Sequence, residues 1–267
     1  MRAAAAVAVL LAVVTGCGRA QSREHEPDRL VVGGTRGAVE HVTENGSSFG
    51  TFGDYSVYLP PGYGRDPDRR YPVVYLLHGG SDSDSLFLDL GIRQAMDDGV
   101  ASGEVEPMIL VFPDGGPKFA GDGNASRSFD DYFAAELVPA VDRRWHTVAD
   151  RTGRAIGGVS LGGRHALQIA GRQHSLVAAA GGHSTTVTRS LEQMAAPLVA
   201  ARIPVYLDVG TSDGLLPIDQ ALADALRRQG ADVCWNPAEG GHTKSYWAAH
   251  LPDYLRFYSD ALAADDG

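Results

Sequence analysis

Short apolar runs alternate with amphipathic stretches along most of the chain from Tyr55 onward. Six runs have the length and the β-branched or aromatic content of buried strands, and five stretches have helical spacing. Because continuous apolar strands alternate with helices, we expect an α/β fold, with a mainly parallel sheet and helices on both faces. The predicted strands are residues 55–59, 72–77, 108–112, 154–159, 204–209 and 232–235; the predicted helices are residues 92–101, 129–145 (kinked at Pro139), 162–171, 216–229 and 246–264.

The first sixteen residues have the pattern of a signal peptide. A positively charged start precedes the apolar run Ala3–Val14, which is too short to span a bilayer. The small residues just before Cys17 resemble a bacterial lipobox, which implies cleavage before Cys17 and attachment of lipid to its sulfur. We therefore expect residues 1–16 to be a lipoprotein signal peptide, and the mature protein to be exported and anchored in the cell envelope through Cys17.

The rest of the chain is expected to form a tether and one domain. Residues 17–30 are polar and lack periodicity, which favours a flexible tether. Residues 31–267 contain no repeat, low-complexity block or internal linker, and we interpret them as a single domain.

Charge and cysteine content narrow the possible partners. The formal net charge is −10, and an acidic surface argues against a nucleic-acid partner. We expect contact with a membrane only through the N-terminal lipid. If Cys17 is lipidated, Cys234 has no partner for a disulfide, and the apolar run around it predicts a buried, inert thiol. The histidine and carboxylate residues show no metal-ligand spacing, so we expect neither a metal nor a cofactor.

One serine stands among glycines where a strand pattern gives way to a helix pattern. Residues 158–162, GVSLG, fit G-x-S-x-G, a strand-to-helix elbow that holds a nucleophilic serine on a strained bend and needs small neighbours. Residues 210–214, GTSDG, fit the same pattern, but the LLP that follows delays the next helix. We predict Ser160 rather than Ser212 as the nucleophile, because only Ser160 leaves room for a later strand followed by an acid.

This elbow requires an acid after a later strand and a histidine near the C-terminus. His242 follows the last predicted strand, and the glycines before it allow its imidazole to reach the strand ends; His183 is its rival. Asp213 lies just past the end of the preceding strand and is the predicted acid. Asp208, inside that strand, and Asp219, one turn into the next helix, remain alternatives.

Two backbone N–H groups are needed to bind an oxyanion. We predict Leu161, the residue after the nucleophile, as one donor. The other is predicted to be Gly80, in the glycine pair after an early strand, with Gly79 or Ser81 as neighbouring alternatives. His78, just before this pair, is expected to be a structural hydrogen-bonding group.

Five ordered sequence blocks resemble the putative-esterase family of α/β-hydrolases. That family includes feruloyl and acetylxylan esterases, S-formylglutathione hydrolase, siderophore esterases and the mycolyltransferases of the antigen 85 group. The resemblance spans roughly residues 50 to 262. The blocks are SVYLPPGYGRDPDRRYPVVYLLHGG, SFDDYFAAELVPAVDRRW, GGVSLGG, LDVGTSDGLL and GGHTKSYWAAHLPDYLRFY.

The resemblance implies an α/β-hydrolase fold and a complete set of catalytic groups. These are a triad and an oxyanion pair formed by Ser160, Asp213, His242, Leu161 and Gly80. Thr243 and Lys244 depart from the family, which often has an acidic and then an aromatic residue after Gly-Gly-His. Substrate specificity is expected to depend on the 113–128 loop. Its charged residues either contact the substrate or are solvated; they are Lys118, Asp122 and Arg127.

The predicted function is hydrolysis of a carboxylic ester through an acyl-enzyme. The substrate is expected to be a small-molecule or glycan-linked ester. Two alternatives remain. One is an acyltransferase of the antigen 85 type, which passes the acyl group to a sugar or lipid hydroxyl. The other is a lipoprotein that binds a ligand on an inactive hydrolase scaffold.

Overall fold

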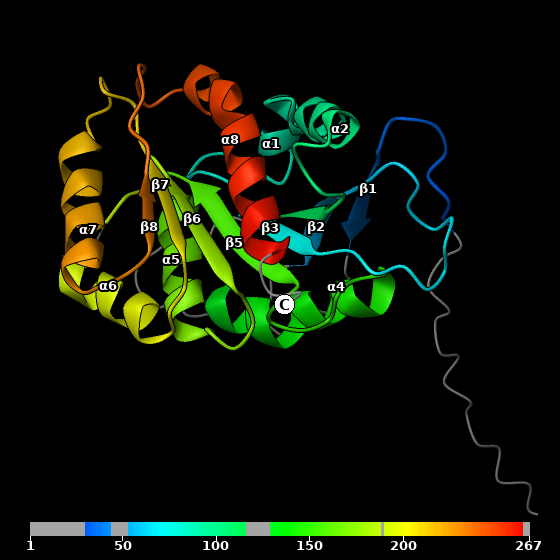
Figure 1. The fold of residues 1–267 in the computed structure, drawn as a ribbon, viewed down its shortest axis with the longest axis horizontal. Helices are drawn as coiled ribbons and strands as arrows, with labels where there is room; N and C mark the ends of the chain where they lie inside the picture. The colour runs from blue at the N-terminus through cyan, green and yellow to red at the C-terminus, as the bar shows by residue number, and fades with distance from the viewer. Residues whose placement is uncertain (1–29, 44–52, 116–128, 188–189, 264–267) are drawn as a thin grey trace, which may run out of the picture.

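An eight-stranded sheet forms the centre of the molecule in the computed structural model, which describes residues 30–43, 53–115, 129–187 and 190–263. The strand order is β1-β2-β4-β3-β5-β6-β7-β8 (Figure 1). β2 pairs antiparallel with both β1 and β4, and the remaining neighbours are parallel. The strands are β1 (Ala38–Thr43), β2 (Asp54–Leu59), β3 (Val73–Leu77), β4 (Ile109–Pro113), β5 (Arg154–Val159), β6 (Ala179–His183), β7 (Val205–Asp208) and β8 (Val233–Trp235).

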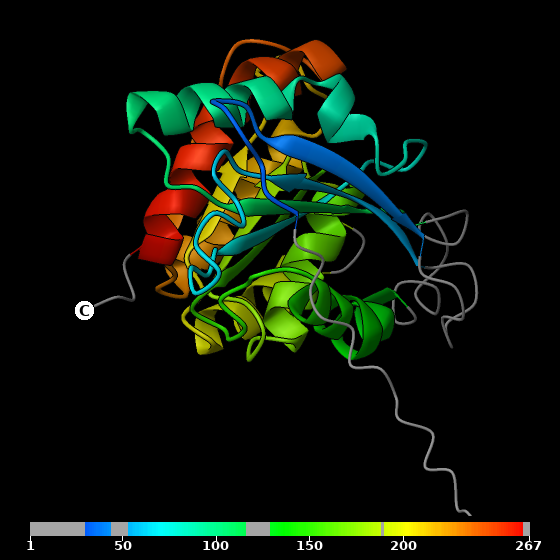
Figure 2. The ribbon, with the colours of Figure 1, turned by 90° about the vertical axis from the view of Figure 1, so that its right-hand side faces the viewer.

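Helices cover both faces of this sheet (Figure 2). One face is covered by α1 (Leu86–Asp89), α2 (Ile92–Ser102) and α8 (Lys244–Ala263). The other is covered by the π-helical turn η1 (Phe133–Leu137), α4 (Val138–Arg144), α5 (Leu161–Arg172), α6 (Leu191–Ala200) and α7 (Leu216–Arg228). The predicted α/β class, with a mainly parallel sheet between two helical layers, is therefore confirmed.

The predicted elements match the structure closely where the hydrophobic pattern is strong. All six predicted strands lie within one residue of their observed bounds. Residues 129–144 are helical, but the expected kink takes the form of η1, which ends two residues before Pro139. Proline lacks the N–H that would close the preceding helical turn, and a wider π-turn accommodates that gap. Four elements were not predicted: β1, β6, α1 and α6.

The glycine content of β6 explains why this strand escaped prediction. Gly181 in β6 is paired with Gly157 in the neighbouring strand β5. A Cβ atom at either position would overlap the hydroxyl of Tyr258, which projects from α8. The two glycines therefore let a tyrosine of α8 approach the sheet, at the expense of the β-branched pattern by which strands are recognised.

The structure corrects the prediction for Cys234. This residue is the middle one of β8, a three-residue strand at the edge of the sheet. Alternate side chains of a strand point to opposite sides, and here Cys234 is exposed while its two neighbours are partly buried. The thiol is thus accessible to solvent and is not part of the core.

Several predictions concern residues outside the described ranges. The signal peptide, the lipidation site Cys17 and almost all of the tether fall there, as do Lys118, Asp122 and Arg127. Among the helices that the structure does describe, none combines the length and the apolar character needed to cross a membrane.

Candidate active site

Ser160 lies on a sharp turn between β5 and α5. Its backbone has φ 55° and ψ −115°, a region that residues with a side chain rarely adopt. The turn is tight because a Cβ at Gly158 would lie 2.5 Å from the carbonyl carbon of Gly162, and a Cβ at Gly162 would overlap the carbonyl oxygen of Leu77. The glycines on either side of the serine are therefore required by space, and the serine hydroxyl projects at the carboxyl end of the sheet.

The structure brings His242 and Asp213 to this serine in a hydrogen-bonded series. Nε2 of His242 lies 3.0 Å from Oγ of Ser160, and Nδ1 lies 2.9 Å from Oδ2 of Asp213. The His242 side chain is 38% exposed, whereas that of Asp213 is 1% exposed. A buried acid thus holds an imidazole whose other nitrogen faces an accessible hydroxyl, the arrangement that general-base activation of a serine requires.

Backbone hydrogen bonds fix the loop that carries Asp213. The N–H of Leu215 donates to Oδ1 of Asp213 at 2.9 Å, which leaves Oδ2 for the histidine. The N–H of Ser212 donates to the carbonyl of Gly240 at 2.7 Å and so ties this loop to the one that carries His242. The second G-x-S-x-G copy therefore forms the loop of the predicted acid, and Ser212 does not occupy a strand-to-helix elbow.

Trp247 contacts His242, and sequence reasoning did not single it out. The indole packs edge-on against the imidazole, with ring centroids 5.1 Å apart. Its Nε1–H donates to Oγ of Ser184 at 3.3 Å, and Ser184 itself has a positive φ of 50°. Trp247 lies one turn into α8, five residues after the predicted base, and that spacing is the only sequence signal that points to it.

The two residues predicted to supply the oxyanion donors lie next to each other. A Cβ at Gly80 would lie 3.4 Å from the side chain of Leu161, the first residue of α5. The N–H groups in the first turn of a helix have no partner inside the helix, and the helix dipole favours negative charge there. Both amides belong to segments that flank Ser160, so the geometry suits an anion bound beside the serine.

His78 orients the loop that carries Gly80. Its Nε2 accepts the N–H of Gly115 at 3.0 Å, so the ring proton lies on Nδ1, which donates to the carbonyl of Gly79 at 2.6 Å. The ring is almost fully buried, and both of its nitrogens hold backbone groups. This matches the structural role predicted for His78.

The sequence model of the family described as "Putative esterase" matches residues 47–258. The chain belongs to this esterase family. A chain of the family is expected to have an α/β-hydrolase-type sheet, and the observed mixed eight-stranded sheet is of that type.

A curated protein aligns with about half of this chain. The endo-1,4-β-xylanase/feruloyl esterase of Xylanibacter ruminicola is 34% identical over 135 residues, which cover 48% of this chain and 19% of that protein. The chain spans between 11% and 28% of the length of five curated relatives that it matches.

Solved structures share the fold at low identity. A ferulic acid esterase superposes with a TM-score of 0.76 at 23% identity, over 85% of this chain and 99% of that one. The S954A mutant of a feruloyl esterase module from Clostridium thermocellum, complexed with sinapinate, superposes with a TM-score of 0.72 at 23% identity. This match covers 87% of the present chain and 92% of the module.

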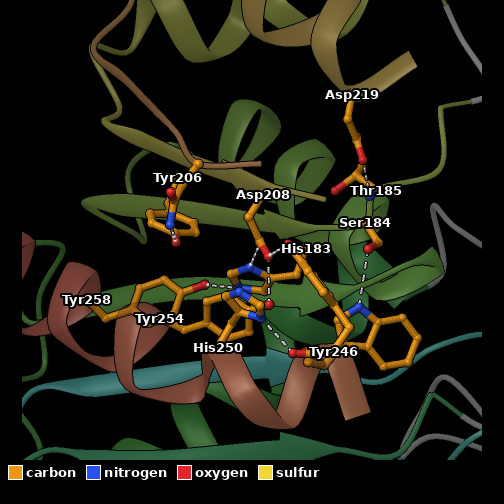
Figure 3. A network of polar contacts seen from close by, with 12 residues as sticks. His183, Ser184, Thr185, Tyr206, Asp208, Asp219, Tyr246, His250, Tyr254 and Tyr258 are labelled. Atoms are coloured by element: carbon orange, nitrogen blue, oxygen red, sulfur yellow. Dashed lines mark hydrogen bonds and ion pairs between the residues drawn. The ribbon is translucent and has the colours of Figure 1, made fainter. Parts of the chain in front are cut away.

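The side chain of the rival histidine, His183, is paired with the alternative acid Asp208 (Figure 3), while its backbone carbonyl accepts the N–H of Ser160 at 2.8 Å. Nδ1 of His183 lies 2.7 Å from Oδ1 of Asp208, and both side chains are completely buried. Nε2 of His183 lies 3.1 Å from the hydroxyl of Tyr258, so neither nitrogen is directed toward the serine. In this esterase-family chain, the pair belongs to the packing of α8 against the sheet.

Three hydroxyl groups complete this buried network. Tyr246 and Tyr254 donate to Oδ2 of Asp208 at 2.9 and 2.8 Å, and the ring of Tyr254 stacks on His183 with centroids 3.6 Å apart. Burial, followed by the nearby Asp208, raises the pKa of Tyr246, Tyr254 and Tyr258 above the usual tyrosine range. The hydroxyls therefore remain protonated and act as donors to the buried carboxylate and imidazole.

Asp219, the other alternative acid, is also buried. Its Oδ2 accepts the N–H of Thr185 at 2.9 Å (Figure 3). Burial raises the pKa of Asp219 to about 8, and the charges of Asp208 and Asp213 add to this effect. The carboxyl is therefore neutral at pH 7 and unsuited to stabilising an imidazolium.

Within the described residues, no three histidine, cysteine or carboxylate side chains are grouped so that they could hold a metal ion.

Proposed function

We propose that this protein is a serine carboxylic-ester hydrolase in which Ser160 is the nucleophile, His242 the general base and Asp213 the acid that orients it. The observation that carries the proposal is the series of two hydrogen bonds, 2.9 and 3.0 Å long, that links Asp213 through His242 to a serine on a strained elbow. Membership of the esterase family supports the same reaction class.

The proposed reaction has two half-reactions. Oγ of Ser160 attacks the ester carbonyl carbon while Nε2 of His242 takes the hydroxyl proton. The tetrahedral intermediate collapses, the bond to the alcohol breaks, and the alcohol leaves with the proton from Nε2. Water then attacks the acyl-enzyme by the same route, which releases the acid and returns the proton to Ser160. Throughout, Asp213 accepts the Nδ1–H and stabilises the transient imidazolium.

The intermediate's negative oxygen is proposed to lie between the amides of Gly80 and Leu161. These donors are fixed before substrate arrives, because His78 holds one loop and the helix α5 holds the other. Preorganised donors of this kind stabilise the transition state more than the neutral ester, and that difference accelerates the reaction.

Hydroxycinnamate esters are the first substrate class to test. The relative from X. ruminicola is named a feruloyl esterase, and one structural neighbour is complexed with sinapinate. A hydroxycinnamoyl group would form the acyl-enzyme on Ser160, and the alcohol of the ester would leave.

The decisive experiment compares the wild-type protein with Ser160→Ala. The substrates are p-nitrophenyl esters from acetate to palmitate and methyl ferulate, with a fluorophosphonate probe to label the nucleophile. We expect ester hydrolysis and labelling by the wild type, and loss of both in Ser160→Ala. Undiminished hydrolysis in the mutant would refute the assignment of the nucleophile, and an unlabelled, inactive wild type would favour a ligand-binding scaffold.

We also propose that the protein is a lipoprotein anchored through Cys17. The support is the apolar run and the small residues before Cys17 in the sequence. A matched pair, wild type and Cys17→Ala, tests it by partition into Triton X-114 after expression in a bacterial host. The wild type should enter the detergent phase, and the proposal is wrong if the two proteins partition alike.

A further inference from the structure

An ion pair joins the two loops that flank Ser160. Nζ of Lys244 lies 2.8 Å from Oδ1 of Asp82, and the two side chains are 57% and 18% exposed. Lys244 is the first residue of α8 and lies two positions after His242, the proposed base. Asp82 lies two positions after Gly80, in the segment 78–82 that we call the oxyanion loop. The ion pair therefore connects the loop of the base with the loop of an oxyanion donor.

The Asp82 carboxylate lies close to where negative charge would develop. The backbone N–H of Asp82 donates to the carbonyl of Gly79 at 3.3 Å. A Cβ on Gly79 would lie 3.2 Å from Oδ2 of Asp82 and 3.8 Å from Cβ of Ser160. The carboxylate and the nucleophilic residue thus lie close to the same point beside Gly79. An uncompensated negative charge there would oppose the formation of an oxyanion.

We propose that Lys244 is a positioning residue for the reaction, acting through Asp82: it holds the oxyanion loop against the loop of His242 and neutralises a carboxylate that lies beside the oxyanion loop. This inference rests on the proposed function of Ser160. It predicts an asymmetry, because loss of Lys244 exposes the oxyanion to an unpaired negative charge, whereas loss of Asp82 does not.

A double-mutant cycle tests the inference. The four proteins are the wild type, Lys244→Met, Asp82→Asn and the double variant, assayed for kcat and KM with p-nitrophenyl acetate. Lys244→Met should lower kcat about tenfold with little change in KM, and Asp82→Asn should lower it about threefold or less. In the double variant, kcat should return to the level of Asp82→Asn, because no unpaired carboxylate remains.

Salt dependence and a remote control separate this role from general destabilisation. Raising the ionic strength from about 0.05 M to about 0.5 M should lower the wild-type kcat about twofold and leave the double variant unchanged. Glu104→Gln removes an exposed ion pair with Arg256 on the same helix, α8. We expect this control to match the wild type in kcat and in salt response.

The results would distinguish failure of this inference from failure of the proposed function. If the wild type hydrolyses no ester, or if Ser160→Ala remains active, the proposed function is wrong. If the wild type depends on Ser160 but Lys244→Met retains more than about half of its kcat, the inference about Lys244 is overturned. It is equally overturned if the effects of the two single substitutions simply multiply in the double variant.

Discussion

The molecule contains two aspartate–histidine pairs that have similar hydrogen bonds and different surroundings. In the buried pair, His183 and Asp208, Nδ1 lies 2.7 Å from the carboxylate; in the surface pair, His242 and Asp213, the distance is 2.9 Å. Both side chains of the buried pair are 0% exposed, whereas the His242 side chain is 38% exposed. The two pairs thus differ in access to the imidazole far more than in the bond between the partners.

The group that faces each Nε2 completes the contrast. In the buried pair it is the hydroxyl of Tyr258, at 3.1 Å, in a cluster where Tyr254 stacks on the imidazole. In the surface pair it is Oγ of Ser160, at 3.0 Å. A hydroxyl enclosed in the core cannot meet a substrate, while an accessible one on a strained elbow can. An Asp–His–hydroxyl series therefore indicates catalysis only together with access and a place for the oxyanion.

Removal of the surface imidazole should have the largest effect on the rate of ester hydrolysis. In His242→Ala, kcat for ester hydrolysis should fall about 10⁴-fold, because Ser160 loses its proton acceptor. The free energy of unfolding should change by about 1 kcal/mol or less, since the ring is partly exposed. Steady-state kinetics and urea unfolding measure the two quantities. A mutant within about tenfold of the wild-type rate would contradict the proposed base.

Removal of the buried imidazole should instead affect stability. His183→Ala leaves a cavity and takes one donor from the Asp208 carboxylate, which should cost about 3–5 kcal/mol in urea unfolding. The rate per active site, titrated with a phosphonate below the unfolding transition, should change less than about tenfold.

His183→Asn is the matched control, because its amide nitrogen lies near the position of Nδ1, can still donate to Asp208 and should recover part of the lost stability. A large loss of rate per active site in either variant, with stability intact, would mean that the buried pair takes part in the chemistry.

Because Asp219 is protonated in the folded protein, its contribution to the free energy of unfolding depends on pH. The pKa of Asp219 is raised to about 8, so between pH 4 and pH 8 the folded protein binds a proton that the unfolded chain has released. Folding stability is therefore lost from this group as pH rises. Relative to the wild type, Asp219→Asn should gain about 3 kcal/mol of stability between pH 5 and pH 8.

Urea unfolding at each pH measures this difference, and the amide oxygen of the asparagine can still accept the N–H of Thr185. The opposite slope, with the wild type gaining on the mutant as pH rises, would show that Asp219 is ionised in the folded protein.

Five of the six predicted strands have strong apolar patterns because they are almost entirely buried. β6 was missed because Tyr258, about 75 residues later, fills the space that side chains at positions 157 and 181 would need, and glycines stand there instead. No local pattern carries that information, since it depends on how α8 crosses the sheet. Cys234 was misassigned for a related reason: the apolar run around it is an edge strand, and only the topology shows which strand is at the edge.

Residues of the candidate site could be predicted from the sequence where the position of the residue depends on a single loop. Ser160, His242 and Asp213 each follow a strand, and strands in a parallel sheet bring their carboxyl ends together. Partners from different loops were not predictable. The ion pair of Lys244 with Asp82 does not follow from spacing along the chain.

Substitutions of Trp247 should have the smallest effect on kcat. They test how firmly the imidazole of the surface pair is held. The indole is 5% exposed and packs edge-on against His242, a contact that holds the imidazole in place without sharing its proton. Trp247→Phe keeps an aromatic ring but loses the hydrogen bond to Ser184, so kcat should fall about twofold to threefold. Trp247→Ala removes the ring as well and should lower kcat about tenfold.

The pH profile of kcat separates positioning from simple destabilisation. If the indole holds the imidazole against Ser160, its loss lowers the plateau of the profile in proportion to the fraction of molecules in which His242 is misplaced. Leu262, on the same helix and 7% exposed, is the control: Leu262→Ala should lower stability and leave the plateau unchanged. Equal plateaus for Trp247→Ala and Leu262→Ala would show that the indole only stabilises α8.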